Sequence, residues 1–171
     1  MEDKTAIIKE LRELCGAGVM DCRNALVKCD WDIKKAADSL KEQGYEKAAK
    51  KADRATGQGL IEAYIHAGGR VGAIIELNCE TDFVARTDEF KTLAHDIAMQ
   101  VTAMSPCYIC KEDLPADSEE PAEVACLMEQ PFIKDQNRTI RDLIIECIAK
   151  TKENIRISRF TRFELGETQQ D

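Results

Sequence analysis

The fold of this chain is decided by residues 60–77, which read LIEAYIHAGGRVGAIIEL. Apolar and polar side chains alternate on both sides of Ala67–Arg70, and a period of two is typical of β-strands. Two glycines in that short connection give the backbone freedom that a tight turn needs. The stretch predicts an antiparallel hairpin over residues 58–79 with one face buried.

A long amphipathic helix is predicted directly after this hairpin. Thr87 is a suitable N-cap, and Asp88 and Glu89 lie in the first turn, where the helix dipole favours anions. The apolar positions then recur with helical spacing, so their common face is expected to cover the hairpin. These positions are Phe90, Leu93, Ala94, Ile97, Ala98 and Val101.

The rest of the C-terminal part predicts two further helices and a strand. Residues 105–120 are acidic and contain two prolines, which indicates a surface loop. Pro121 is well placed to begin a short helix that residues 130–132 end. Thr139 and Asp142 resemble a capping box before a second helix. Residues 155–165 alternate again and predict a long third strand.

The N-terminal part predicts three short helices over residues 4–43. A glycine-rich break at residues 16–18 separates the first two, Asp30 is a possible N-cap of the third, and Gly44 is expected to end it. Residues 44–56 are charged and rich in alanine, which indicates a helical or flexible connector. The expected domains are therefore residues 1–43, 44–56 and 57–171.

The fold class expected from these elements is α+β, with a three-helix domain followed by a β-β-α-α-α-β core that contains a small antiparallel sheet. A three-stranded sheet has two edges, and the long C-terminal strand is a candidate edge strand. Because an exposed edge can pair with another chain, a homodimer is plausible.

Composition excludes several classes of protein. Residues 1–54 carry 12 basic and 11 acidic side chains. Residues 55–171 carry 12 basic and 21 acidic side chains, and the formal net charge of the whole chain is −8. This balance argues against a general nucleic-acid binder. The charged N-terminus lacks the apolar segment of a signal peptide, and no apolar run is long enough to cross a membrane. We expect a cytoplasmic protein with mostly reduced cysteines.

No motif for catalysis or metal binding stands out. Cys107 and Cys110 form a single C-x-x-C pair, whereas a structural zinc site usually needs a second pair. Cys15, Cys22 and Cys29 recur every seven residues, but the glycine break favours core packing. The two histidines lie on different predicted elements. We expect no enzyme activity, no cofactor and no metal.

Residues 78–86, NCETDFVAR, form an unusual connection between a strand and a helix. In one interpretation Phe83 folds back into the core and Asp82 caps a turn, and residue physics alone favours it. In the other, Phe83 is exposed and inserts into a cleft of a partner, because aromatic side chains are preferred interface anchors.

The chain resembles the elongation factor Ts family of bacteria over nearly its whole length. The most specific similarity is TDFVAR at residues 81–86. Four further segments agree with the family in order: LRELCGAGVMDC at 11–22, KAAKKA at 47–52, QPFI at 130–133 and RFTRFELGE at 159–167.

This resemblance implies guanine-nucleotide exchange on elongation factor Tu, the GTPase that delivers aminoacyl-tRNA to the ribosome. It implies that residues 1–43 resemble a ubiquitin-associated domain and dock on the GTPase domain. The resemblance further implies that Asp82 and Phe83 act at the nucleotide site and that His66 reaches a distal domain of the partner. The partner-binding residues that it implies are Ile8, Val19, Met20, His66, Thr81, Asp82, Phe83 and Val84.

A single copy of the core resembles the short members of the family, in which two copies associate, so the resemblance also implies a homodimer. Two other classes remain open. An adaptor without exchange activity would share the apolar surface around Val19 and Met20 but has no need for an Asp-Phe pair. A zinc or thiol-redox protein would have a bound metal or a low-pKa thiol at Cys107 or Cys110.

Overall fold

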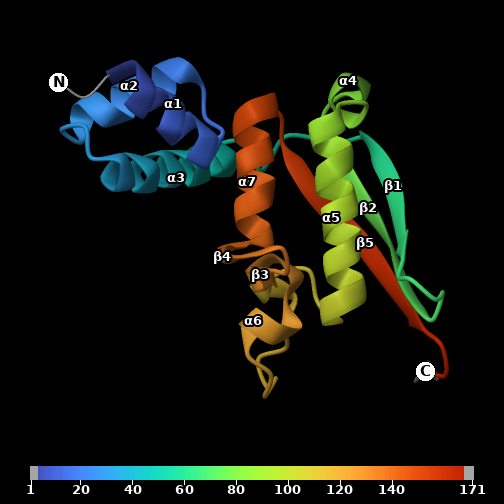
Figure 1. Cartoon of the computed structure of the whole chain (residues 1–171). Coiled ribbons are helices and arrows are strands. Elements are labelled where there is room, and N and C mark those ends of the chain that lie inside the picture. The colour runs from blue at the N-terminus through green and yellow to red at the C-terminus, as the bar shows by residue number, and fades with distance from the viewer. Residues whose placement is uncertain (1–3, 168–171) are drawn as a thin grey trace. The chain divides into compact units, whose positions relative to one another are not determined.

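The computed structural model of the chain describes residues 4–167 (Figure 1). Helices come first and are followed by a mixed region with a small antiparallel sheet, which confirms the α+β class. The helices are α1 (Lys4–Cys15), α2 (Val19–Lys28), α3 (Ile33–Ala49), α4 (Asp82–Ala85), α5 (Asp88–Met104), η1 (Lys111–Asp113), α6 (Ala122–Ala125), η2 (Leu127–Glu129) and α7 (Ile140–Thr151). The strands are β1 (Gln58–Ile65), β2 (Val71–Cys79), β3 (Pro131–Phe132), β4 (Asp135–Thr139) and β5 (Ile155–Glu164).

The chain divides into two compact units. Unit 1 takes in the described residues up to Arg54 together with Ile145–Asn154. Unit 2 takes in Ala55–Ile144 and the described residues from Ile155 onward. The division falls within α7, so a segment from late in the chain completes the N-terminal unit.

The three predicted helices of unit 1 are present and enclose a small apolar core. α1 ends at Cys15 because Gly16 takes a positive φ of 64°, and the Gly16 N–H donates to the Arg12 carbonyl at 2.8 Å. The buried residues that hold the helices together are Leu11, Cys22, Ala25, Leu26, Ala36 and Leu40.

Both ends of α3 differ from the prediction. Asp32, not Asp30, is the N-cap: its carboxylate accepts a backbone N–H three residues on at 3.0 Å. Asp30 has a φ of 49°, outside the extended conformation that an N-cap needs. The expectation that Gly44 ends the helix is wrong, since α3 continues to Ala49. Gly44 is buried where a Cβ would lie 3.1 Å from the Cγ2 of Ile145, so it serves close packing within unit 1.

Asn154 connects the late segment of unit 1 to the end of the N-terminal region. Its buried side-chain amide donates to the carbonyls of Ala52, at 3.1 Å, and Arg54, at 2.9 Å. Buried amides need such partners, because an unpaired one costs the desolvation free energy of the group.

Unit 2 is built on an antiparallel sheet with the order β1-β2-β5. The hairpin over residues 58–79, the helix that begins after the N-cap Thr87, and the edge position of the C-terminal strand are all confirmed. Figure 1 shows α5 running across one face of the sheet. The central strand β2 buries Ala73, Ile75, Leu77 and Cys79 on that side.

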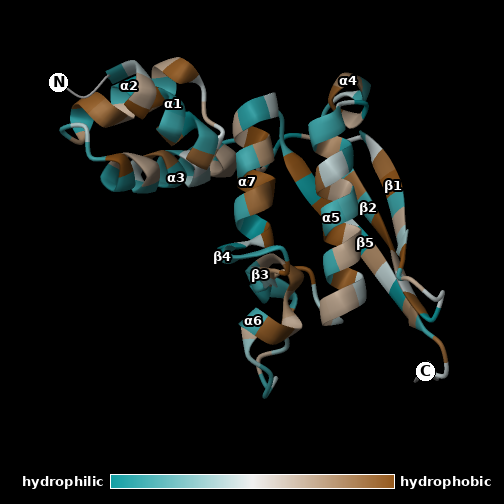
Figure 2. Cartoon of the chain, viewed as in Figure 1, coloured by the Kyte–Doolittle hydropathy of each residue, from teal (hydrophilic) through white to brown (hydrophobic). Residues whose placement is uncertain are grey.

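The other face of the sheet is uncovered within the described chain. It is mixed: exposed apolar side chains lie beside an ion pair between Glu76 and Arg159 at 2.7 Å, and Glu76 is directly opposite Ile61. Ile61 is 67% exposed and Ile65 is 65% exposed, whereas Glu62 and Tyr64, in alternate positions of β1, are half-buried. The register explains this: Glu62 lies opposite the buried Ile75, so it shares the face that α5 covers. Figure 2 marks apolar residues along all three strands.

A second, two-stranded sheet was not predicted. The expected stop at residues 130–132 itself contains β3, which pairs with β4. Buried Gln100 of α5 fixes this segment: its amide nitrogen donates to the Gln130 side chain and the Pro131 carbonyl, each at 3.1 Å, and its oxygen accepts from the Ile133 N–H at 2.9 Å.

The start of α7 follows the prediction. The Asp142 carboxylate accepts the Thr139 N–H at 3.0 Å, and the Thr139 hydroxyl accepts the Asp142 N–H at 3.2 Å, which is a capping box with Asp in place of Glu. No helix within residues 4–167 is long and apolar enough to cross a membrane.

Gly59 provides a test of the sheet register. Its φ is 150°, and a Cβ there would lie 2.2 Å from the Leu77 carbonyl oxygen. We expect Gly59→Ala to lower the free energy of unfolding by about 2 kcal/mol or more, because backbone of the central strand would have to move. Gly57→Ala is the control, since a Cβ at Gly57 meets nothing within 4 Å. Urea unfolding that found the two variants equally stable would contradict the register.

Candidate partner-binding surface

A one-turn helix, α4, interrupts the connection between β2 and α5. The Thr81 hydroxyl oxygen accepts the Val84 N–H at 3.5 Å and caps the start of α4. The Thr87 hydroxyl donates to the Val84 carbonyl at 2.8 Å and accepts the Phe90 N–H at 3.3 Å. Thr87 therefore joins the end of α4 to the start of α5, and the turn has a defined conformation.

Phe83 projects from α4 and is 78% exposed. The interpretation in which Phe83 folds back into the core is therefore wrong. Ala85 is the buried anchor of the turn, and Val84 is half-buried. Asp82 forms an ion pair with Arg86 at 2.8 Å one turn later. An aromatic ring is thus held in solvent beside a carboxylate, on a capped helix.

His66 lies at the β1–β2 turn, exposed. The backbone N–H of His66 donates to the Val71 carbonyl at 2.9 Å and closes the hairpin. The Tyr64 hydroxyl lies 3.2 Å from the His66 Nδ1, and the Tyr64 ring packs edge-on against His95 of α5. The His95 Nδ1 lies 3.1 Å from a Glu62 carboxylate oxygen. His66 and His95 therefore both contact side chains of β1, although the sequence put them on separate elements. This cluster was not predicted.

The predicted residues of unit 2 fall at two ends of one strand. Thr81, Asp82, Phe83 and Val84 follow the C-terminal end of β2, and His66 precedes its N-terminal end. Nine residues of strand separate these ends, which is about 30 Å at ~3.4 Å per residue. A partner that contacts both must extend along the whole hairpin.

Unit 1 presents a second apolar surface. Val19 and Met20, at the start of α2, are 51% and 59% exposed. Ile8 is half-buried and packs against the core of unit 1, so less of it faces solvent. Leu14 and Val27 are also more than half exposed and were not predicted as site residues. Helical spacing puts Met20 and Val27 on the same side of α2.

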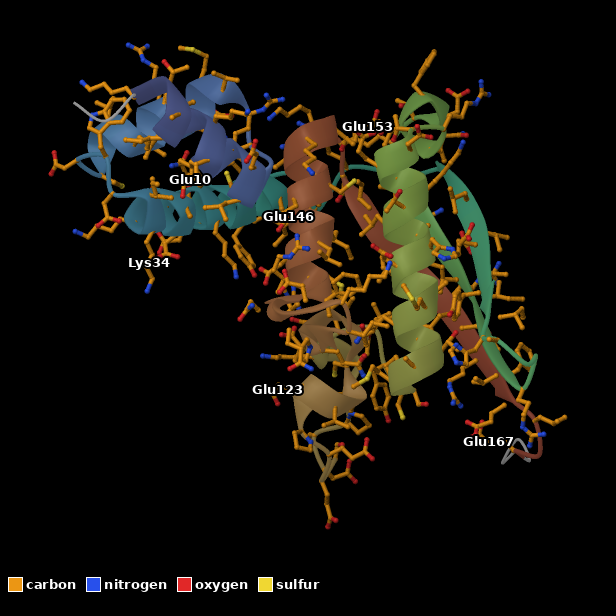
Figure 3. All side chains as sticks on the ribbon, in the orientation of Figure 1. Glu10, Lys34, Glu123, Glu146, Glu153 and Glu167 are labelled. Carbon is orange, nitrogen blue, oxygen red and sulfur yellow. The ribbon has the colours of Figure 1, made fainter. Side chains whose placement is uncertain are left out.

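Cys107 and Cys110 lie before η1, with free thiols. Burial, and next a hydrogen bond to the Asp113 carboxylate, raise the pKa of the Cys110 thiol to about 12. A reactive thiolate needs the opposite shift. Within residues 4–167, no three His, Cys, Asp or Glu side chains are grouped as a metal site. The acidic segment that follows is mostly exposed, as predicted. Figure 3 labels Glu123 of α6, the short helix that comes after it.

Comparison with known proteins identifies the family. The family description "Elongation factor TS" matches residues 33–123. The chain is 45% identical to elongation factor Ts of Thermotoga sp. strain RQ2 over 199 residues, with all of both chains covered. It is 48% identical to that of Carboxydothermus hydrogenoformans over 191 residues, covering 94% of this chain and 88% of the relative. The chain belongs to the elongation factor Ts family.

Membership of the elongation factor Ts family gives the chain a role in translation elongation. The matched segment contains the whole hairpin, α4 and α5. Val19 and Met20 lie outside that segment but inside the span that the Thermotoga relative covers. The exposed Phe83 on α4 and the exposed pair Val19 and Met20 on α2 thus both belong to the part of the chain that is similar to elongation factor Ts.

Thr87 tests how the exposed ring is held. We expect Thr87→Ala to lower the free energy of unfolding by about 1 kcal/mol, because the cap of α5 is lost. Thr87→Ser keeps the hydroxyl and is the matched control, with a smaller loss expected. Amide hydrogen exchange at Phe83–Thr87 should be faster in Thr87→Ala alone. Equal exchange in both variants would show that the hydroxyl does not hold α4.

Proposed function

We propose that this chain is a guanine-nucleotide exchange factor for elongation factor Tu. The observation that carries the proposal is the 78% exposed ring of Phe83 on the capped helix α4. Exposure of a large aromatic side chain on an ordered turn has no benefit for folding, whereas such rings are the preferred anchors of interfaces.

The mechanism requires no covalent chemistry. In GTPases, Mg²⁺ bridges the phosphates of the nucleotide and protein ligands, and so helps to retain the nucleotide. Phe83 would insert between helices of the GTPase domain and displace them, with Asp82 at its side. The displaced helices no longer hold the metal and phosphates in place, and GDP dissociates. The chain acts as a binding protein and not as an enzyme, and it needs no cofactor of its own.

Two further contacts would hold the partner while Phe83 acts. Val19 and Met20 offer an exposed apolar pair for the GTPase domain, and the half-buried Ile8 of α1 would add to this contact while it packs against the core of unit 1. His66 and its turn, at the far end of β2, would reach a distal domain of the partner. We place this activity in the cytoplasm, where translation takes place, and the net charge of −8 supports a protein partner rather than direct nucleic-acid binding.

We also propose that the protein is a homodimer formed through the open face of the sheet. This face carries large apolar side chains that are at least 44% exposed, Ile61, Ile65, Ile74 and Phe163. The ion pair on this face joins Glu76 and Arg159 across β2 and β5, so these two charges are already paired within one copy. The opposite face is already buried under α5, so the open face is the one available for sheet-on-sheet packing. A second copy presents the same face, which a two-fold axis makes self-complementary.

The activity is tested by the release of fluorescent GDP from elongation factor Tu in excess unlabelled nucleotide. Acceleration by substoichiometric amounts of the chain is expected, because an exchange factor is released by incoming nucleotide and acts again. If the folded chain binds the GTPase without accelerating release, it is a binding module and the proposal is wrong.

Phe83→Ala is the decisive variant. We expect it to slow nucleotide exchange at least tenfold while changing the free energy of unfolding by no more than about 0.5 kcal/mol, because the ring contacts solvent. The matched control is Val124→Ala in α6, which also truncates an exposed apolar side chain (55% exposed) but lies outside the proposed surface. Exchange at the wild-type rate in Phe83→Ala, or a loss of folding, would contradict the assignment.

The dimer is tested by placing a charge on the open face. We expect the wild type to sediment as a dimer and Ile61→Glu to sediment as a folded monomer, because burying the new carboxylate is unfavourable. Leu14→Glu makes the same change at an equally exposed position of unit 1 and should stay dimeric. A monomeric wild type, or a dimeric Ile61→Glu, would refute this interface.

A further inference from the structure

Two cysteines of unit 1 are brought together across the break between α1 and α2. Cys15 is the last residue of α1, and Cys22 is the fourth residue of α2. Their sulfur atoms are 3.9 Å apart. A glycine break separates them in sequence, so the seven-residue spacing alone gives no reason for this contact. It arises because Gly16 turns the chain back with a positive φ.

The two thiols differ in access. Cys15 is half-buried, and its Sγ donates to the Leu11 carbonyl at 2.9 Å. Cys22 is fully buried in the core of unit 1 and lies 3.7 Å from the Ala17 carbonyl oxygen. A small oxidant in solution therefore reaches Cys15 first, with Cys22 directly behind it.

We propose that Cys15 and Cys22 are a dithiol that closes into a reversible disulfide on exposure to a low-molecular-weight disulfide such as glutathione disulfide. Closure requires the sulfurs to approach from 3.9 Å to about 2.05 Å. Rotation of both side chains, with adjustment of the Gly-Ala-Gly connection, supplies that movement. The closed form links α1 covalently to α2.

The reaction balances in two exchange steps. The thiolate of Cys15 attacks one sulfur of glutathione disulfide and forms a mixed disulfide, and the first glutathione leaves and takes up a proton. The thiolate of Cys22 then attacks the Cys15 sulfur, and the second glutathione leaves as a thiol. Two protein thiols are oxidised to one disulfide, and one glutathione disulfide is reduced to two thiols.

The environment of Cys22 sets the pace of the second step. In the reduced chain burial, followed by the neighbouring Cys15 thiol and the Asp21 carboxylate, raises the pKa of Cys22 to about 11, although Arg12 opposes the shift. In the mixed disulfide Cys15 has no ionisable thiol, so burial and Asp21 are the causes that still keep the Cys22 pKa raised. Little Cys22 thiolate exists at neutral pH, so closure is slow and responds to sustained oxidation. The reduced form is the resting state in a reducing compartment.

Closure also affects the apolar surface of unit 1, an effect that rests on the proposed function. Val19 and Met20 lie in the first turn of α2, within three residues of Cys22. Moving Cys22 toward α1 displaces that turn, so the oxidised form should dock more weakly on the GTPase. The disulfide itself does not depend on any partner.

The disulfide is tested on the full chain in buffers of oxidised and reduced glutathione, with later alkylation of free thiols and trypsin digestion. Cleavage after Arg12 and Arg23 releases both cysteines in one peptide, residues 13–23. In oxidising buffer we expect this peptide to escape alkylation and to be lighter by two hydrogens, and dithiothreitol should reverse the change. A lasting glutathione adduct on Cys15, or two alkylated thiols, would overturn the proposal.

Three variants make the result specific. Cys15→Ser should abolish closure, and because Cys15 is only half-buried the variant should fold. Cys22→Ala should also abolish closure. Cys29→Ser removes the remaining cysteine of the N-terminal three-helix region and should leave closure unchanged. Closure in Cys15→Ser, or its loss in Cys29→Ser, would show that other thiols react.

A second readout compares nucleotide exchange by the reduced and oxidised chains. We expect the oxidised wild type to lose at least about threefold in apparent affinity for the GTPase, and Cys15→Ser to show no such loss. An inactive reduced chain would refute the proposed function and leave the disulfide standing. Equal activity of the reduced and closed forms would refute the effect on docking.

Discussion

Burial of one face of β2 beneath α5 is the interaction on which the rest of unit 2 depends. Ala73, Ile75, Leu77 and Cys79 are at most 1% exposed on that face. At ~25 cal/mol per Å² of apolar surface, such burial outweighs any single hydrogen bond of the unit. Because β1 and β5 both pair with β2, the register of the whole sheet follows from this packing. The ends of β2 then place the two candidate contacts, the His66 turn and α4, on a rigid strand.

The sequence predicted the elements whose signal is local. The hairpin follows from a period of two around a glycine turn, and the start of α5 follows from the Thr87 cap. Three features depend on distant residues and had no local signal. Gly44 continues a helix because Ile145 packs against it, and β4 pairs with β3 although its sequence DQNRT has no apolar alternation. The face of β1 that is buried is set by its register with β2, not by its own hydropathy.

The residues of the candidate site were even harder to predict from local sequence patterns. Residue physics favours burial of Phe83, yet the ring is exposed. A helix of four residues is too short for periodicity to reveal, so no pattern indicates which side of α4 faces solvent. Phe83 was singled out by the resemblance to a family signature, which does not depend on local hydropathy or periodicity. The Glu62–Tyr64–His95 cluster had neither signal, because its members come from two elements that are separate in sequence.

Magnitudes indicate how the proposed exchange must be divided among contacts. Complete burial of one exposed Phe contributes about 1.5–3 kcal/mol, which is roughly a 10- to 150-fold change in an equilibrium constant. One ring cannot by itself balance the combined affinity of a GTPase for Mg²⁺ and a nucleotide. The factor and the nucleotide are mutually antagonistic ligands, and linkage makes that antagonism reciprocal. The free energy spent in distorting the nucleotide site must therefore come from contacts away from it. Val19, Met20 and His66 are suited to that task because they lie on elements distinct from α4, and so add binding without occupying the site that incoming GTP must enter.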